Sequence, residues 1–308
     1  MKNILLFSLF SLLFSACDRV TNPYPKVASS DLDQSLYPGN WSDYIANEWP
    51  MFTTNTNTNR NVMIEDFTGH TCNNCPPANS QATLIANNNP GRVYVATLHT
   101  GPTGMGSLQA VQLPDYPTDW TNPNGLEIGT FFGSIPGSAF QGNPRGTVSR
   151  VLNSGQLTLH PSSWLSQTNN VLAANVLKVN LQSHANYYPT TRGLFVHTEV
   201  DLLDESLVDN LSLVVYLIED SIIGDQKLLD NSHDSQYVHK EVMRGTIDNR
   251  AFGRAIDATV KDANGNYYLN YSYKLPDVYN PNIMHVLIFV IDQTTHEVYQ
   301  VIKQELIE

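Results

Sequence analysis

Apolar residues along the first half of the chain fall into blocks that predict strands and helices in turn. Residues 61–68 and 92–99 are nearly continuous apolar runs, as expected of strands in a buried parallel sheet. Helical spacing over residues 77–87 places a helix between them, so the three segments predict a strand, helix, strand unit. A turn-rich insertion at 101–124 precedes segments that predict a helix, a strand and a helix, at 126–132, 146–151 and 162–177.

After residue 177 the pattern changes to strands alone. Short β-branched or alternating runs separated by turns occupy residues 194–200, 211–218, 267–273 and 285–291. Short strands in this arrangement are typical of a β-sandwich. The sequence therefore predicts an α/β domain over residues 61–176 and an all-β, immunoglobulin-like sandwich over residues 177–308.

The N-terminus has the pattern of an export signal. Lys2 precedes an apolar run at 4–14, too short to span a membrane, and Ser15-Ala16-Cys17 follows. Small residues before a cysteine are typical of a bacterial lipoprotein signal, so we expect residues 1–16 to be removed and Cys17 to be acylated. Phe14 fills a site that is usually aliphatic, which leaves a plain secretory signal as the alternative.

Residues 17–60 are rich in Asn, Pro, Ser and Thr and predict a tether or N-terminal extension. Within it, residues 41–52 hold enough aromatic side chains to pack on a domain. The whole chain has a formal net charge of -12 and 41% hydrophobic residues. It can therefore fill two cores, and an acidic surface without a basic cluster argues against binding nucleic acid or anionic lipid.

Cys72 and Cys75 form the motif that most suggests chemistry. They lie between the first strand and its helix, where a helix N-terminus would favour the thiolate of Cys72. With Cys17 acylated, no third cysteine is left to pair with them, and a disulfide closing so short a loop adds little stability. An oxidising compartment makes them a candidate redox pair. A zinc site that adds His70 and His99 is the weaker alternative.

The order of these elements resembles that of thioredoxin-like proteins, and Asp66, six residues before Cys72, matches the buried acid of that fold. The resemblance implies that Cys72 is exposed and attacks as a thiolate, that Cys75 resolves the mixed disulfide, and that Asp66 takes or relays the proton of Cys75. A solvent-facing carboxylate is the alternative for Asp66. Because side chains alternate along a strand, only one of Asp66 and Glu65 is expected to face inward.

Thioredoxin-like proteins also place a cis-proline against the disulfide. Pro144 directly precedes the strand predicted at 146–151 and is our candidate, with Pro136 as the rival and a trans bond as the alternative at either. Thr71 and Asn73-Asn74 depart from the residues that surround the cysteines of active oxidoreductases.

Several short motifs point to a narrower group of proteins. They are Glu65-Asp66-Phe67-Thr68-Gly69-His70, the Cys-x-x-Cys-Pro, Tyr116-Pro117-Thr118-Asp119, and Tyr237-Val238-His239 leading to Met243-Arg244. Over residues 60–308 the chain resembles the twenty-eight-kilodalton outer-membrane-protein family of Bacteroidota lipoproteins. The resemblance implies a lipid-anchored protein of the bacterial cell envelope, in the outer membrane.

Two functions of different class follow. The first is a thiol-disulfide oxidoreductase that acts through Cys72 and Cys75 on exported protein thiols or disulfides, or with an envelope redox partner, without a cofactor or a metal. The second is a non-catalytic surface lipoprotein that binds a protein or a glycan. The Cys-x-x-Cys and Asp66 favour the first, and the substitutions around the cysteines favour the second.

Overall fold

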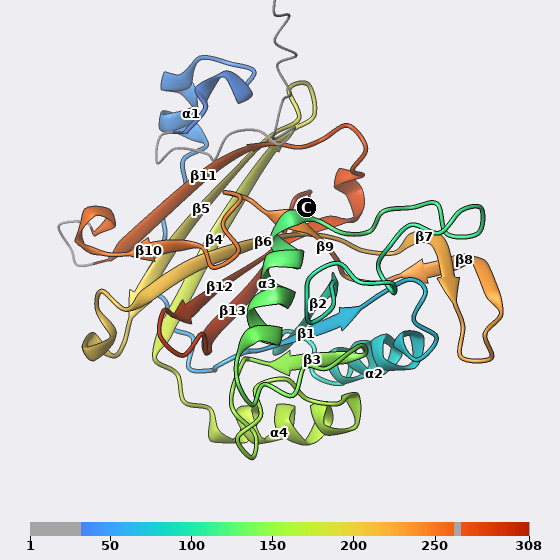
Figure 1. The fold of residues 1–308 in the computed structure, drawn as a ribbon. Helices are drawn as coiled ribbons and strands as arrows, with labels where there is room; N and C mark the ends of the chain where they lie inside the picture. The colour runs from blue at the N-terminus through green and yellow to red at the C-terminus, as the bar shows by residue number, and fades with distance from the viewer. Residues whose placement is uncertain (1–31, 262–265, 308) are drawn as a thin grey trace, which may run out of the picture.

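The centre of the molecule is a mixed sheet with strands from both halves of the chain (Figure 1). The computed structural model describes residues 32–261 and 266–307, so the expected signal peptide and Cys17 lie outside the described residues. The sheet has eight strands in the order β13-β12-β6-β9-β2-β1-β3, with β10 paired to β6. Their bounds are β1 (Val62–Thr68), β2 (Val93–His99), β3 (Arg145–Val148), β6 (Leu211–Glu219), β9 (Val242–Thr246), β10 (Arg254–Ile256), β12 (Met284–Asp292) and β13 (Val298–Glu305).

The predicted strand, helix, strand unit is confirmed. β1 and β2 pair in parallel along their whole length, and α2 (Cys75–Asn87) connects them. β3 pairs antiparallel with β1, and α3 (Pro123–Ser134) and α4 (Trp164–Ala174) complete this half. Every residue of β1 is buried, which explains why its sequence is an apolar run rather than an alternating pattern.

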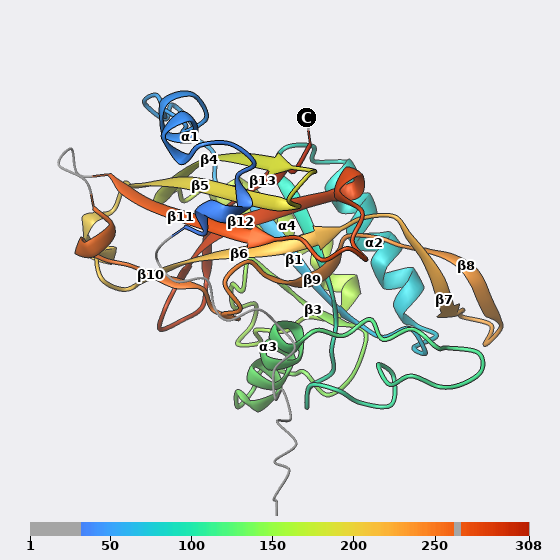
Figure 2. The ribbon, with the colours of Figure 1, turned by 90° about the horizontal axis from the view of Figure 1, so that it is seen from above.

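The two faces of the central sheet have different covers (Figure 2). On one face α3 packs over a continuous core that includes Phe67, Phe132 and Phe289. On the other face α2 and α4 cover β1 to β3, and a three-stranded sheet covers β6 and β12. That sheet has the order β11-β5-β4, with bounds β4 (Val179–Tyr188), β5 (Gly193–Leu202) and β11 (Tyr267–Lys274).

The antiparallel sheets expected after residue 177 are present, but the sandwich they form is not a separate unit. Its larger layer is β6, β12 and β13, which continue the sheet of β1 and β2 through β9. β6 is buried on both sides: Leu217 faces the three-stranded sheet, and Tyr216 faces the α3 side. A division of the chain at residue 176 therefore stays a prediction, because the two halves share one sheet.

The N-terminal extension packs on the outer face of the three-stranded sheet, as its aromatic content suggested. Its helix α1 (Trp41–Asn47) stacks the rings of Trp41 and Tyr44 at a centroid distance of 4.6 Å. Tyr44 is fully buried and its hydroxyl lies 2.6 Å from Nε2 of His197 on β5. In the described part of the chain, no helix combines the length and the apolar character needed to cross a membrane.

A small hairpin lies outside both sheets. It consists of β7 (Ile222–Lys227) and β8 (His233–His239), which pair only with each other. His233 and His239 lie at the two ends of β8. In Figure 1 the hairpin projects beyond the end of β1.

A buried ion pair of the first half of the chain accepts a hydrogen bond from the second half. Arg150 donates from Nη2 to Oε1 of Glu65 at 2.7 Å and from Nε to Oε2 at 2.8 Å, and both side chains are fully buried. The hydroxyl of Tyr216, on β6, donates to Oε1 of Glu65 at 3.0 Å, and Thr147 donates to Oε2 at 2.7 Å. Burial by itself would raise the pKa of Glu65, but the Arg150 charge and these hydrogen bonds outweigh it and lower the pKa.

We predict that Arg150→Met destabilises the fold by about 3–5 kcal/mol, because it leaves the Glu65 carboxylate buried without a positive charge beside it. Lys303→Met is the matched control, since Lys303 pairs with Glu305 on the surface, and should cost less than about 1 kcal/mol. Urea unfolding of both variants measures the difference. Equal, small changes in the two would contradict the structural role of the buried pair.

Candidate active site

The disulfide lies where β1 ends and α2 begins. Sγ of Cys72 and Sγ of Cys75 are bonded at 2.09 Å, with their Cα atoms 5.4 Å apart. The helix starts at Cys75 rather than before it, and Pro76 and Pro77 occupy its first turn, where backbone N–H groups have no helical partner. Cys75 therefore sits at the helix N-terminus, and Cys72 lies in the preceding turn.

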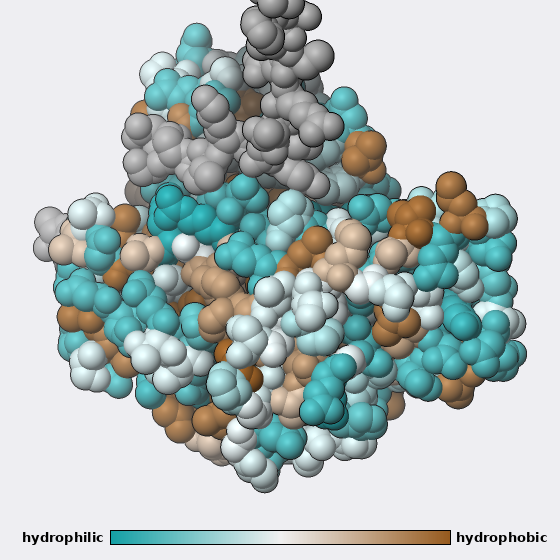
Figure 3. Space-filling view, viewed as in Figure 1, coloured by the Kyte–Doolittle hydropathy of each residue, from teal (hydrophilic) through white to brown (hydrophobic). Residues whose placement is uncertain are grey.

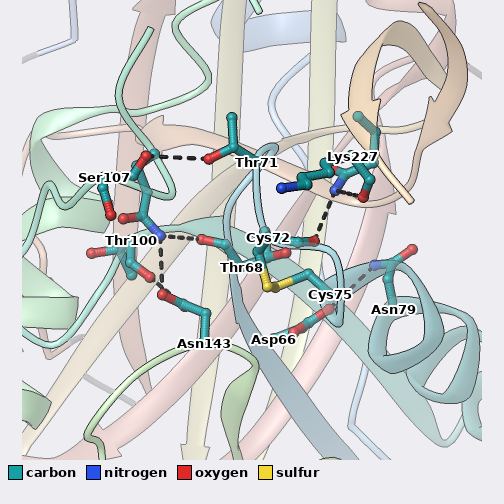
Figure 4. The surroundings of a disulfide bond; sticks show 12 residues. Asp66, Thr68, Thr71, Cys72, Cys75, Asn79, Thr100, Ser107, Asn143 and Lys227 are labelled. Carbon is teal, nitrogen blue, oxygen red and sulfur yellow. Dashed lines mark hydrogen bonds between the residues drawn. A yellow bond between two sulfur atoms is a disulfide. The ribbon is translucent and has the colours of Figure 1, made fainter. Parts of the chain in front are cut away.

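Cys72 is not exposed, which corrects what the thioredoxin-like resemblance implied. Its exposed fraction is 3%, and that of Cys75 is 1%. The hairpin β7–β8, which comes from the second half of the chain, contacts this turn (Figure 4). Gln226 Nε2 donates to the backbone oxygen of Cys72 at 3.1 Å, and the amide of Lys227 donates to the backbone oxygen of His70 at 2.8 Å.

Asp66 and Glu65 are both fully buried, which corrects the expectation that only one of them faces inward. The alternation along β1 holds, but the sheet is covered on both faces, so each side chain enters a different core. Glu65 faces the α3 side and meets Arg150. Asp66 faces α2, where Asn79 Nδ2 lies 3.4 Å from its Oδ2, and Figure 4 shows it pointing toward Cys75.

The carboxyl of Asp66 has the properties of a proton carrier. Burial raises its pKa to about 7, and the hydrogen bond from Asn79 lowers it only slightly in comparison. Asn79 also donates to Oγ1 of Thr97 at 3.0 Å, which holds the amide against β2. A group that titrates near neutral pH beside a dithiol or disulfide can give or take a proton as sulfur is reduced or oxidised.

Pro144 lies across a groove from the start of α2. The Asn143–Pro144 peptide bond is cis, and the bond before Pro136 is not among the cis bonds of the described chain. The groove, about 740 Å³ in volume, runs between the first turn of α2 and the segments 141–145 and 160–162. Leu229, in the turn of the hairpin β7–β8, also lines it.

Sequence patterns did not indicate two glutamines that organise the site. Gln109, in the insertion, donates from Nε2 to the backbone oxygen of Thr68 at 2.7 Å and to Oδ1 of Asn143 at 3.1 Å. It thus ties the end of β1 to the residue before Pro144. Gln226 ties the hairpin to Cys72 from 154 positions further along the chain. Neither position has a local motif that predicts such a contact.

Gly69 is a glycine that the close approach of the insertion requires. A Cβ atom at this position would lie 2.4 Å from the backbone oxygen of Leu108, so only glycine lets the insertion pass this close to the turn before Cys72. The same approach lets the amide of Thr71 donate to that oxygen at 3.2 Å.

The histidines of the zinc alternative are buried behind the disulfide. The ring centroids of His70 and His99 are 6.4 Å apart, and His99 stacks on Trp120 and faces His239. Within residues 32–261 and 266–307, no three His, Cys, Asp or Glu side chains form a group suited to a metal ion.

Comparisons with known proteins place the chain in a family. Residues 138–308 match the family model of the outer membrane protein Omp28, and they make up more than half of the 308 residues. The chain belongs to the Omp28 family. The family resemblance found in the motifs is thereby confirmed, although the matched segment begins after Cys72 and Cys75. No curated protein matches the chain.

Solved structures give this Omp28-family chain the fold of HBP35 of Porphyromonas gingivalis. The two share a TM-score of 0.61 at 17% identity, over 80% of this chain and 76% of HBP35. A protein of Agrobacterium tumefaciens has a TM-score of 0.50 at 10% identity, over 80% of this chain and 95% of its own. A domain of the outer membrane lipoprotein Omp28 from P. gingivalis is 22% identical but has a TM-score of 0.28. The match covers 42% of this chain and 89% of that domain. The first two structures show likeness of fold alone.

We predict that Asp66→Asn stabilises the oxidised protein at pH 8 but not at pH 4. Because the native pKa is about 7 and the ordinary value is 3.8, the folded state keeps a proton that the unfolded state loses between these pH values. Stability of the wild type therefore falls as pH rises through this window, by up to about 4 kcal/mol. Urea unfolding at both pH values measures the effect.

Asp277→Asn is the matched control, because the side chain of Asp277 is 93% exposed. It should leave the difference between pH 4 and pH 8 unchanged. If Asp66→Asn behaves like this control, the carboxyl of Asp66 is not held in the native state as described.

Proposed function

We propose that this Omp28-family chain is a lipid-anchored thiol-disulfide oxidoreductase of the outer membrane that acts on exported proteins. One observation carries the proposal: a buried carboxyl, Asp66, with a pKa near 7 points toward the Cys72–Cys75 disulfide. A disulfide that served stability alone would need no such group, and a loop this short adds little stability. Residues 61–176 would form the thioredoxin-like part, and Cys17 would carry the lipid.

The reaction exchanges one disulfide for another. In the oxidising direction a substrate thiolate attacks Sγ of Cys72, the Cys72–Cys75 bond breaks, and the Cys75 thiolate takes the proton of Asp66. A second substrate thiolate then attacks the substrate sulfur of the mixed disulfide and releases the Cys72 thiolate. Two electrons thus pass from the substrate to the chain. In the reverse, reducing direction Asp66 accepts the proton of Cys75.

The surroundings of the site favour a polypeptide substrate. The groove beside Pro144 has a lining of mostly neutral side chains. Apolar side chains are exposed nearby on the insertion, at Val111 and Leu113, and on the hairpin, at Ile223 and Val238. Figure 3 shows hydrophobic surface over the insertion and the hairpin, on its right-hand side.

A surface lipoprotein that binds a protein or glycan without turnover is the second candidate. The burial of Cys72 under the hairpin favours it, because a nucleophilic cysteine needs access to its substrate. The two candidates differ in one property, the reduction potential of the disulfide.

We predict that the chain carrying Cys17→Ser shows a reversible two-electron transition between about -270 and -120 mV, the range of known oxidoreductases. The measurement is an equilibrium titration against defined dithiol/disulfide ratios, with free thiols trapped by alkylation. The same chain with Cys72→Ser has no disulfide to reduce and is the control. A potential below about -300 mV, as in structural disulfides, would reject the enzyme and favour the binding protein.

A further inference from the structure

The hairpin β7–β8 has the construction of a movable element. It continues the antiparallel pair β6–β9, whose last paired residues are Glu219 and Val242, but it leaves the central sheet. Both connections contain a non-glycine residue in the left-handed region, Ser221 at φ 57° and Glu241 at φ 54°. Terminal positions of this kind are where a change of backbone angles can swing a segment as a unit.

Besides ring contacts of His233 with Tyr116 and of His239 with Trp120, three hydrogen bonds hold the hairpin against the turn of the disulfide. They are the hydrogen bonds from Gln226 to Cys72 and from Lys227 to His70, and a bond of 3.2 Å between the side chains of Asn73 and Asn231 in the turn. On the inner side Gly224 lies against Trp120, where an added Cβ would come within 2.4 Å of the indole. The hairpin therefore fits closely over the site without sharing a strand pairing with it.

The space behind the hairpin contains polar groups that the closed form leaves unsatisfied. Both ring nitrogens of His99, Nε2 of His239 and Nε1 of Trp120 are buried without a hydrogen-bond partner among the described residues. His239 belongs to β8, and its ring centroid is 4.2 Å from that of Trp120. Unpaired buried polar groups cost free energy that hydration recovers, so opening the hairpin would relieve part of the cost of closure.

We infer that the hairpin β7–β8 is a cap that must open before a thiol or disulfide can reach Sγ of Cys72. The biological role of the cap rests on the proposed function, since a cap matters only if the disulfide reacts. The effect of the cap on access to the disulfide is independent of that function and can be measured with any reductant. The cap also reconciles a buried Cys72 with a reactive site: the second half of the chain controls the first.

The test is the rate at which a water-soluble phosphine reduces Cys72–Cys75 in the full chain carrying Cys17→Ser. We expect the folded protein to be reduced at least tenfold more slowly than the same chain in denaturant. Gln226→Ala removes the bond to the Cys72 carbonyl and should speed reduction about fivefold, the worth of one such hydrogen bond.

Gln236→Ala is the matched control, because Gln236 lies on the same hairpin and its side chain bonds only to the backbone of Ser235. It should change the rate by less than twofold. Gly224→Ala, which wedges the hairpin off Trp120, should also speed reduction, and it keeps the test valid if Gln226→Ala does not fold.

If the folded wild type were reduced as fast as the chain in denaturant, the hairpin would not limit access to the disulfide, and the inference would be wrong. Equal rates in Gln226→Ala, Gly224→Ala and Gln236→Ala would contradict it as well. Failure of the proposed function looks different: the cap variants would still speed reduction, but the potential would lie in the range of structural disulfides.

Discussion

A buried network built on the ion pair of Glu65 and Arg150 links the two halves of this chain. Arg150 follows β3, Glu65 lies on β1, and the Tyr216 hydroxyl that completes the network comes from β6 in the second half. Burying two charges is costly unless they are paired and hydrogen-bonded, so the network specifies one register of β1, β3 and β6. That register determines where the end of β1, and with it the disulfide, meets the second half.

Neighbouring carboxylates on β1 thus have opposite roles. Glu65 is held ionised by a guanidinium on one face of the sheet, and its pKa is lowered. Asp66 on the other face has an amide, Asn79, as its partner, and its pKa is raised to about 7. The same burial therefore leaves one carboxylate ionised and gives the other a pKa near neutral, because only one of the two has a cation beside it.

Local sequence signals were sufficient to predict β1, β2 and the helix α2 between them, and to single out the two cysteines. The apolar runs predicted β1 and β2, and the cysteine spacing and Pro144 located the site. The partners of Glu65 and Cys72 had no such signal, because Arg150 is 85 positions from Glu65 and Gln226 is 154 positions from Cys72. Periodicity predicted strands in the second half, but it cannot show that β6 pairs with a strand, β9, that continues the sheet of β1 and β2.

The hairpin is the main consequence of that shared sheet. β9 lies beside β2 and pairs with β6, so the segment between β6 and β9 emerges next to the turn that holds Cys72. The second half thus does more than complete a core: it contacts the disulfide turn and lines part of the groove with Leu229.

The most direct test of the account is to trap the reaction in cells that produce the lipidated protein with Cys75→Ser. Without the resolving cysteine, a mixed disulfide on Cys72 cannot be released by the chain itself. The account predicts reductant-sensitive adducts with exported proteins, identified by mass spectrometry after acid quenching and alkylation, and their absence when Cys72→Ser is added. A chain that accumulates to the same level with a free Cys72, or joins only to itself, would contradict it.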